Sequence, residues 1–140
     1  MRARRPNDVS LLLALFLGGC GSHTEILPAG HEAQSQTSPD GLSRAFVWMP
    51  ESSGTLGATN SQPYQVWIQY LKVGHEQQLL LKAAETDGLK LSWTSPGELQ
   101  ICYGPTYIYH LQNYFDYETE FHTLYHVEVL LNRAKTFHDC

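Results

Sequence analysis

The sequence predicts a small, mainly β protein: an antiparallel meander of about six strands that forms a twisted sheet, a small sandwich or a barrel. Three observations predict this class. Apolar and polar residues alternate with a period of two in several segments, as in half-buried strands. Short turns containing Gly, Pro, Asp or Ser separate these segments. Aromatic residues make up 11% of the chain and charged residues only 16%, which is typical of a folded domain rather than a disordered chain.

Three strands are predicted in the first half of the domain. A turn at 38–41 (Ser-Pro-Asp-Gly) opens it, because Pro presets φ, Asp caps the turn and Gly takes the left-handed conformation. The predicted strands are 44–49, 64–71 and 79–85. A long polar loop over 50–63 and a turn through Gly74 connect them. The apolar run 79–85 also fits one helical turn, and a strand is preferred.

A hairpin and an ambiguous segment follow. Residues 89–94 alternate, a Ser-Pro-Gly turn comes next, and the return strand covers 99–103. Two interpretations of 104–118 stay open. Pro105 favours a short helix near 105–115, because Ile108, Leu111 and Phe115 would share one face, whereas the tyrosines of this segment alternate as in a strand.

The last predicted strand covers 120–131. Its odd-numbered residues from Phe121 to Val129 share one face, and Leu124 lies with the charged and histidine residues on the other. Residues 132–140 form a polar tail. The predicted domain therefore extends from 38 to 140.

The N-terminus has the parts of a secretory signal. Three arginines precede seven apolar residues, Leu11 to Leu17, a run too short to cross a bilayer. Leu17-Gly18-Gly19-Cys20 resembles the bacterial lipobox. The resemblance implies cleavage after residue 19, a diacylglycerol on the Cys20 thiol and acylation of the new amino group. Two or more acyl chains give stable anchoring.

The lipobox places the mature protein in the bacterial cell envelope. Residues 20–37 are predicted to be a polar tether between the lipid and the domain. Because Gly21 rather than aspartate follows Cys20, the outer membrane is favoured over the inner one, by analogy with enterobacterial lipoproteins. Residues 1–19 remove three of the nine Lys and Arg residues and one of the fourteen Asp and Glu residues, so the net charge moves from −5 to −7. An acidic chain without a basic cluster indicates no nucleic-acid partner.

The remaining two cysteines, Cys102 and Cys140, have two alternatives. In an oxidising compartment they would form a disulfide that holds the C-terminus on the domain. Otherwise Cys102 is a buried thiol and Cys140 belongs to a mobile end. The sequence leaves both open.

Histidines at 122 and 126 suggest a metal site, with Glu120 or Glu128 as a third ligand. This spacing converges on one ion in a helix, but in a strand the two positions lie about 13 Å apart. Because the alternation predicts a strand, neither a metal nor a cofactor is expected.

The segment from Tyr103 to Tyr125 contains six of the eight tyrosines. Such a cluster suits sugar stacking, although tyrosines are also common in ordinary strands and at core edges. No Gly-x-Ser-x-Gly or Ser-x-x-Lys motif for nucleophilic catalysis occurs. The preferred hypothesis is a non-enzymatic envelope lipoprotein that binds another protein or a cell-wall component. The alternative is an enzyme acting on envelope glycans, with Asp116, Glu118 or Glu120 as acid and base.

Three segments carry a family resemblance: the Ser38–Gly41 turn, Gly57-Ala-Thr59 ahead of the Gln65-Val-Trp-Ile68 strand, and the hairpin Leu91–Ile101. They resemble a blade of periplasmic Tol-type β-propellers and, in their order, a group of small uncharacterised bacterial lipoproteins with one blade-like sheet. Leu56 stands where some members have a cysteine, so no disulfide carries over there. The resemblance implies a β-sheet fold and no catalytic role.

Overall fold

The computed structural model describes residues 25–51, 63–72, 76–84, 89–119, 121–136 and 139–140. The described part of the chain is mainly β, as predicted, and contains nine strands and no helix. Among the described residues there is thus no helix that could span a membrane. The signal segment, Cys20, Glu120 and the Gly57-Ala-Thr59 motif lie outside the described residues.

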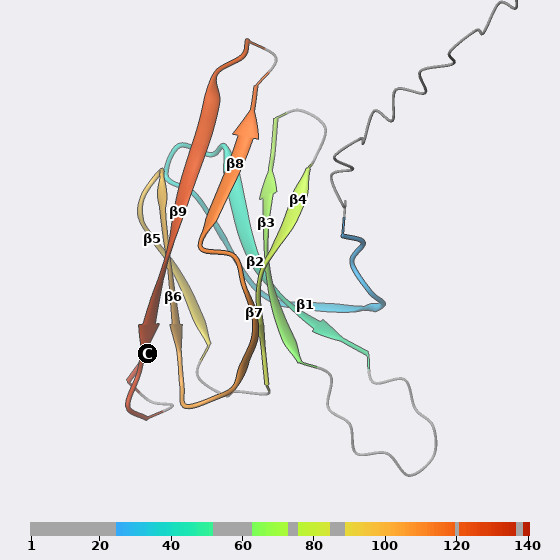
Figure 1. Cartoon of the computed structure of the whole chain (residues 1–140), viewed down its shortest axis with the longest axis vertical. Helices are drawn as coiled ribbons and strands as arrows, with labels where there is room; N and C mark the ends of the chain where they lie inside the picture. Colours follow the sequence, from blue (N-terminus) through green and yellow to red (C-terminus); the bar gives the residue numbers. More distant parts are fainter. Residues whose placement is uncertain (1–24, 52–62, 73–75, 85–88, 120, 137–138) are drawn as a thin grey trace, which may run out of the picture.

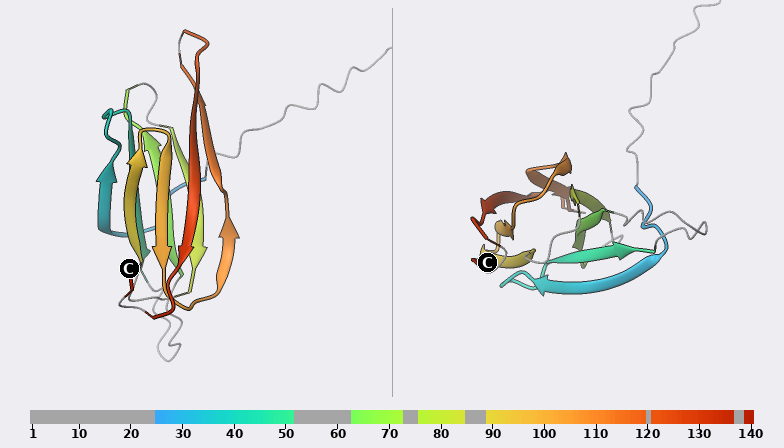
Figure 2. Two further views of the ribbon diagram at one scale, coloured as in Figure 1. Left: turned by 90° about the vertical axis from the view of Figure 1, so that its left-hand side faces the viewer. Right: turned by 90° about the horizontal axis from the view of Figure 1, so that it is seen from below.

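The strands form two sheets that pack face to face without closing into a barrel (Figures 1 and 2). The larger sheet has the order β1-β2-β3-β4-β7 and consists of β1 (Gly30–Thr37), β2 (Ser43–Pro50), β3 (Tyr64–Tyr70), β4 (Gln77–Ala83) and β7 (Ile108–Leu111). The smaller sheet has the order β5-β6-β9-β8 and consists of β5 (Lys90–Ser95), β6 (Glu98–Tyr103), β8 (Tyr114–Glu118) and β9 (Leu124–Arg133).

The main core lies between the two sheets and takes side chains from both. Val66, Ile68 and Leu81 come from the larger sheet, and Leu99 and Ile101 from the smaller one; each is 0% exposed. These residues follow the period-two alternation of their strands, which directs every second side chain inward. The strand predicted over 79–85 is confirmed as β4.

A second apolar cluster covers the outer face of the larger sheet. Phe46, Trp67 and Leu79 are buried there, with Leu27 and Trp48 packed against them. The segment before β1 helps to close this cluster, because the Trp48 Nε1–H donates to the Pro28 carbonyl at 3.1 Å. The larger sheet is therefore apolar on both faces.

The prediction of a short helix near 105–115 is wrong, because this segment forms β7 and the start of β8. The Ala84 N–H donates to Tyr107 O at 2.8 Å and the Gln112 N–H to Leu80 O at 2.7 Å, so the backbone pairs with β4 instead of with itself. The helix-like spacing has another cause. A bulge at Tyr109 places Ile108 and Leu111 on the core-facing side of β7, although Leu111 remains 44% exposed, and Phe115 is directed inward from β8 in the other sheet.

The β domain also begins earlier than the predicted residue 38, since residues 30–37, which were predicted to belong to a polar tether, form β1. This strand pairs antiparallel with β2, from Gly30↔Pro50 to Thr37↔Arg44. It shows no apolar alternation because it is an edge strand and most of its residues are exposed. Residues 30–37 form a strand in spite of their polar composition, because the Ser38–Gly41 turn brings them beside β2 and their backbone pairs with it.

The simple meander is wrong in two places. After β4 the chain leaves the larger sheet, so the neighbour of β4 is β7 rather than β5. In the smaller sheet β6 pairs with β9 in parallel, from Glu98↔Glu128 to Tyr103↔Arg133. The predicted inward face of the last strand holds for Tyr125, Val127 and Val129, whereas Phe121 is 87% exposed.

Candidate functional site

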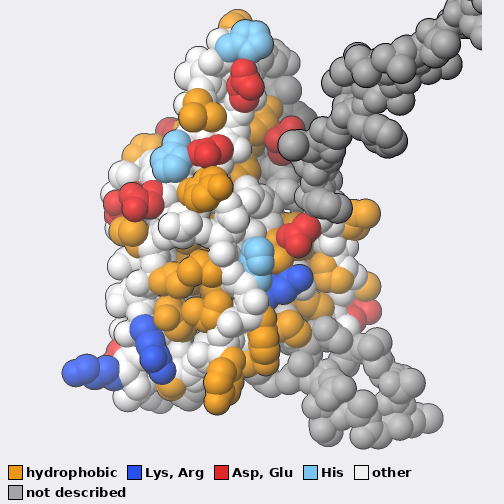
Figure 3. Space-filling model, in the orientation of Figure 1, with side chains coloured by type: hydrophobic (Ala, Val, Ile, Leu, Met, Phe, Trp, Pro, Cys, Tyr) orange, Lys and Arg blue, Asp and Glu red, His pale blue; other side chains and the backbone are white. Residues whose placement is uncertain are grey.

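Most of the exposed large apolar side chains belong to one stretch of the chain, from the segment before β7 to β9. The structure exposes eight large hydrophobic residues in its described part, and seven of them lie between residues 107 and 130. We call this set the β7–β9 surface: Tyr107, Tyr109, Leu111, Tyr114, Phe121, Leu124 and Leu130. Figure 3 shows hydrophobic side chains gathered between the lower ends of β9 and β7. The tyrosine-rich segment is therefore partly surface and partly core, since Tyr117 is only 6% exposed.

The β8–β9 hairpin projects beyond the rest of the smaller sheet (Figures 1 and 2). Its turn is closed by hydrogen bonds from the Thr119 N–H to Thr123 O and from the His122 N–H to Thr119 O, both 2.9 Å. His122 takes a φ of 56°, which a non-glycine residue rarely adopts. This tight turn leaves Phe121 and Leu124 87% and 66% exposed at the tip.

Two histidine–carboxylate pairs line the outer face of this hairpin. His126 Nδ1 donates to Asp116 Oδ1 at 2.5 Å across the strands, and His122 Nδ1 donates to Glu118 Oε1 at 2.8 Å. The Tyr114 ring stacks beside that of His126, with centroids 6.4 Å apart. Polar pairs and exposed apolar residues thus alternate along one ribbon.

The arrangement does not bring His122 and His126 to one ion. His126 lies within β9 and His122 lies in the turn before it, and each is paired with a different carboxylate. Across the residues that the structure describes, no group of three or more His, Cys, Asp or Glu side chains is placed to hold a metal. Glu128 lies opposite Tyr114 in the strand register.

The carboxylates of the glycan-enzyme hypothesis, Asp116 and Glu118, share the exposed face of β8. Their side chains are 40% and 64% exposed and each is already engaged by a histidine. Glycoside hydrolysis uses two carboxyl groups that flank the scissile bond of a sugar held in a cleft, and one of them activates the attacking water. Two open positions on one strand face favour a contact surface over such a site.

Asp40 of the Ser-Pro-Asp-Gly turn connects the two sheets. Its carboxylate accepts hydrogen bonds from Ser38 Oγ at 2.6 Å, the Leu42 N–H at 3.0 Å and Tyr125 Oη in β9 at 3.1 Å. Burial acts to raise the pKa of Asp40, but these hydrogen bonds outweigh it and hold the pKa below its usual value. Burial, together with the neighbouring Asp40 charge, raises the pKa of Tyr125.

We expect Asp40→Asn to destabilise the protein by about 1 kcal/mol at neutral pH, the size of a hydrogen bond to an exposed charged group. Because the folded-state pKa is lowered, the carboxylate stabilises the fold above the unfolded pKa of about 3.9, and this contribution is lost as pH falls through the folded value. Urea titrations from pH 7 to 3 should therefore show the two proteins converging in acid. A constant gap would contradict the role of the charge. Glu128→Gln, an exposed carboxylate whose side chain has no hydrogen bond to any described residue, is the control.

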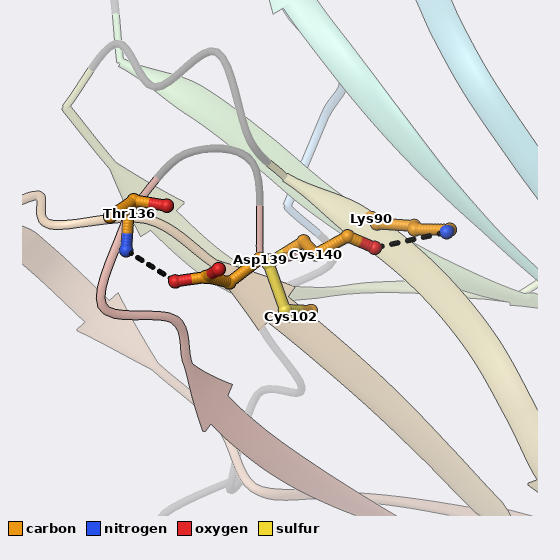
Figure 4. The surroundings of a disulfide bond; sticks show 5 residues. All are labelled: Lys90, Cys102, Thr136, Asp139 and Cys140. Carbon is orange, nitrogen blue, oxygen red and sulfur yellow. Dashed lines mark hydrogen bonds between the residues drawn. A yellow bond between two sulfur atoms is a disulfide. The ribbon is translucent and has the colours of Figure 1, made fainter.

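The sequence left two states open for Cys102 and Cys140. In the structure the two cysteines form a disulfide bond (Figure 4). The bond joins β6 to the C-terminus across 38 residues, with the Cα atoms 5.7 Å apart. Lys90 Nζ donates to the Cys140 carbonyl at 3.0 Å, and the Thr136 N–H donates to Asp139 Oδ2 at 2.9 Å. The end of the polar tail is thus held against the β5–β6 hairpin.

The chain matches no family model, no curated protein and no solved structure. Its fold and surface define its class: a two-sheet β sandwich whose exposed large apolar residues, in the described part, lie mainly within 107–130. The sequence hypotheses stressed the carboxylates and histidines of 116–126. They placed Leu124 on the polar face but missed Leu111 and Leu130 as surface residues, because local alternation does not tell a solvated face from a covered one.

Proposed function

We propose that this protein is a lipid-anchored module of the bacterial cell envelope that binds another envelope protein or a cell-wall component through the β7–β9 surface. Lipidated Cys20 holds it in the membrane, with the outer membrane favoured, and the β sandwich acts as the binding domain. The support for the anchor is the Leu-Gly-Gly-Cys motif that follows a basic and apolar N-terminus.

One observation carries the binding role: seven of the eight exposed large hydrophobic residues in the described part fall within residues 107–130, on β7, β8, β9 and the segments beside them. Single exposed apolar residues are normal, whereas a cluster of them marks an interaction site. Three of the seven are tyrosines, which are enriched in binding surfaces because one end is apolar and the other forms hydrogen bonds. The Asp116–His126 and Glu118–His122 pairs supply a polar border.

We expect the two parts of this proposal to separate in one experiment. Intact cells that produce the full-length chain are cross-linked, fractionated and analysed by mass spectrometry for partners of the chain. Cys20→Ser should move the protein out of the membrane fraction, since it removes the acylation site. The double change Phe121→Ser and Leu124→Ser should leave the protein in the membrane fraction and reduce its cross-linked partner about tenfold or more.

Matched controls make each result specific. His31→Ser and Gln36→Ser, at exposed positions of β1, an edge strand of the larger sheet, should leave both anchoring and cross-linking unchanged. A Cys20→Ser protein that still sediments with membranes would disprove the anchor. A tip variant that retains the wild-type cross-linking pattern would disprove the binding surface.

A further inference from the structure

The smaller sheet has an open strand position beside the second half of β9. On one side β9 pairs with β6 throughout Glu128–Arg133. On its other side β8 pairs only with Leu124–Glu128 and ends there. Within the described part of the chain, no strand lies beside Leu130–Arg133 on that side. In the left view of Figure 2, β8 accompanies only the upper half of β9.

The backbone groups that face this position can be identified. The Glu128 and Ala134 N–H groups donate to Gly97 O and Tyr103 O, on the β6 side, whereas the Val129 N–H donates to Asn113 O on the β8 side. Along a strand, the N–H and C=O groups of successive residues point alternately toward the two neighbouring strands. The N–H and C=O groups of Leu131 and Arg133 therefore point into the open position.

The core is also incompletely covered beneath this position. Leu111 of β7 lies opposite Leu81 in the strand register, yet Leu111 is 44% exposed and Leu81 is 0% exposed. Leu131 packs against the main core and is only half-buried. An added strand would cover both side chains at the same time as it paired with β9.

The other edges of the two sheets are protected in ways that this one is not. The β1 and β5 edges approach each other, with Trp93 Nε1–H donating to Gln36 O at 3.1 Å, and the edge strands β1 and β7 of the larger sheet each carry a bulge. The β8 edge carries Asp116 and Glu118. Natural sheets use such bulges, edge charges and covered edges to prevent strand addition. The stretch Leu130–Arg133 is regular in its register with β6 and contains neither proline nor a carboxylate.

The charge of this edge indicates which kind of partner segment would bind beside β9. Arg133 and Lys135 stand at the end of this edge and form no ion pair with any residue that the structure describes. Figure 3 shows basic side chains at the lower end of this face, beside the hydrophobic patch. A second copy of this edge would bring another arginine but no carboxylate. An acidic partner segment complements it better.

We propose that an extended segment of a partner protein, with apolar residues at alternate positions and at least one acidic residue, adds to the smaller sheet as a strand beside Leu130–Arg133. Main-chain hydrogen bonds to Leu131 and Arg133 give the affinity, and Leu111 and Leu131 receive the apolar side chains. This inference rests on the proposed binding function and names the class of partner.

The test uses a display library of short random peptides selected on the purified full-length chain. Selected sequences should alternate apolar and polar residues and contain Asp or Glu. Affinities of one synthesised peptide for two variants then separate charge from backbone pairing. Arg133→Ala removes the charge and should weaken binding a few-fold. Arg133→Pro also removes an N–H that points away from β6 and should weaken binding about tenfold more, while leaving the β6–β9 pairing in place.

Thermal unfolding of both variants checks that each remains folded. In the wild type, hydrogen exchange of the Leu131 and Arg133 amides should slow only when the peptide is bound. Equal peptide affinities for Arg133→Ala and Arg133→Pro, or no enriched peptide, would overturn the strand-addition proposal. A wild-type dimer that Arg133→Pro dissociates would overturn it in favour of self-association. None of these results alters the cross-linking test at Phe121 and Leu124, so the two proposals fail independently.

Discussion

Cys140→Ser is expected to lower the free energy of unfolding by about 4 kcal/mol, because the Cys102–Cys140 bond closes a loop of 38 residues. Without the bond, the unfolded chain gains the entropy that the loop had removed. The native state also loses its anchor for the end of the chain, where Lys90 contacts the Cys140 carbonyl. In a protein whose total stability lies in the range of about 5–15 kcal/mol, this is a large fraction.

Urea unfolding under oxidising conditions measures this loss. The double variant Cys102→Ser and Cys140→Ser, and the wild type after reduction, should show nearly the same lower stability. Lys90→Met removes only the hydrogen bond to Cys140 and should cost less than about 1 kcal/mol, because this contact is exposed. A reduced protein with unchanged stability would mean that the C-terminus contributes nothing to the fold.

The second large effect is expected for Trp67→Ala, with a loss of about 3–5 kcal/mol. Trp67 is 2% exposed on the outer face of the larger sheet, within the cluster of Phe46, Leu79 and Leu27. Its Nε1–H donates to Gln65 Oε1 at 2.9 Å. Truncation opens a cavity in this cluster and leaves the Gln65 oxygen without its donor.

The matched control is Gln69→Ala, two residues further along the same face of β3, where the side chain is half-buried and packs in neither cluster. We expect a change of less than about 0.5 kcal/mol there. Far-ultraviolet circular dichroism confirms the fold, and chemical unfolding gives the difference. If Trp67→Ala and Gln69→Ala cost the same, the outer cluster does not stabilise the protein.

Much of the strand content could be predicted from sequence, because alternation is a local property. The segments 44–49, 64–71 and 89–103 correspond to β2, β3 and the β5–β6 hairpin. The errors arose where a local pattern had a non-local cause. Ile108, Leu111 and Phe115 are spaced as in a helix, but they belong to strands. A bulge at Tyr109 and a change of sheet account for this spacing.

The candidate surface was less predictable than the strands. The tyrosine-rich segment was visible in the sequence, but Tyr117 is buried and stacks on Tyr70 at 4.0 Å between ring centroids, while Tyr109 is 66% exposed. Which tyrosine faces solvent depends on which strand lies opposite. The same holds for the open edge of β9, which exists only because β8 begins at Tyr114, so that its pairing with β9 stops at Glu128.

By itself, the sequence determined the properties that neighbouring residues impose on one another: the β class, most strand positions, the Ser-Pro-Asp-Gly turn and the lipobox-like motif. The tertiary structure decided everything that joins distant segments. It made residues 30–37 a strand by pairing them with β2, set β9 parallel to β6, joined Cys102 to Cys140 and buried Trp67 on an outer face. Those outcomes depend on contacts between residues far apart in the chain, to which alternation and turn chemistry are blind.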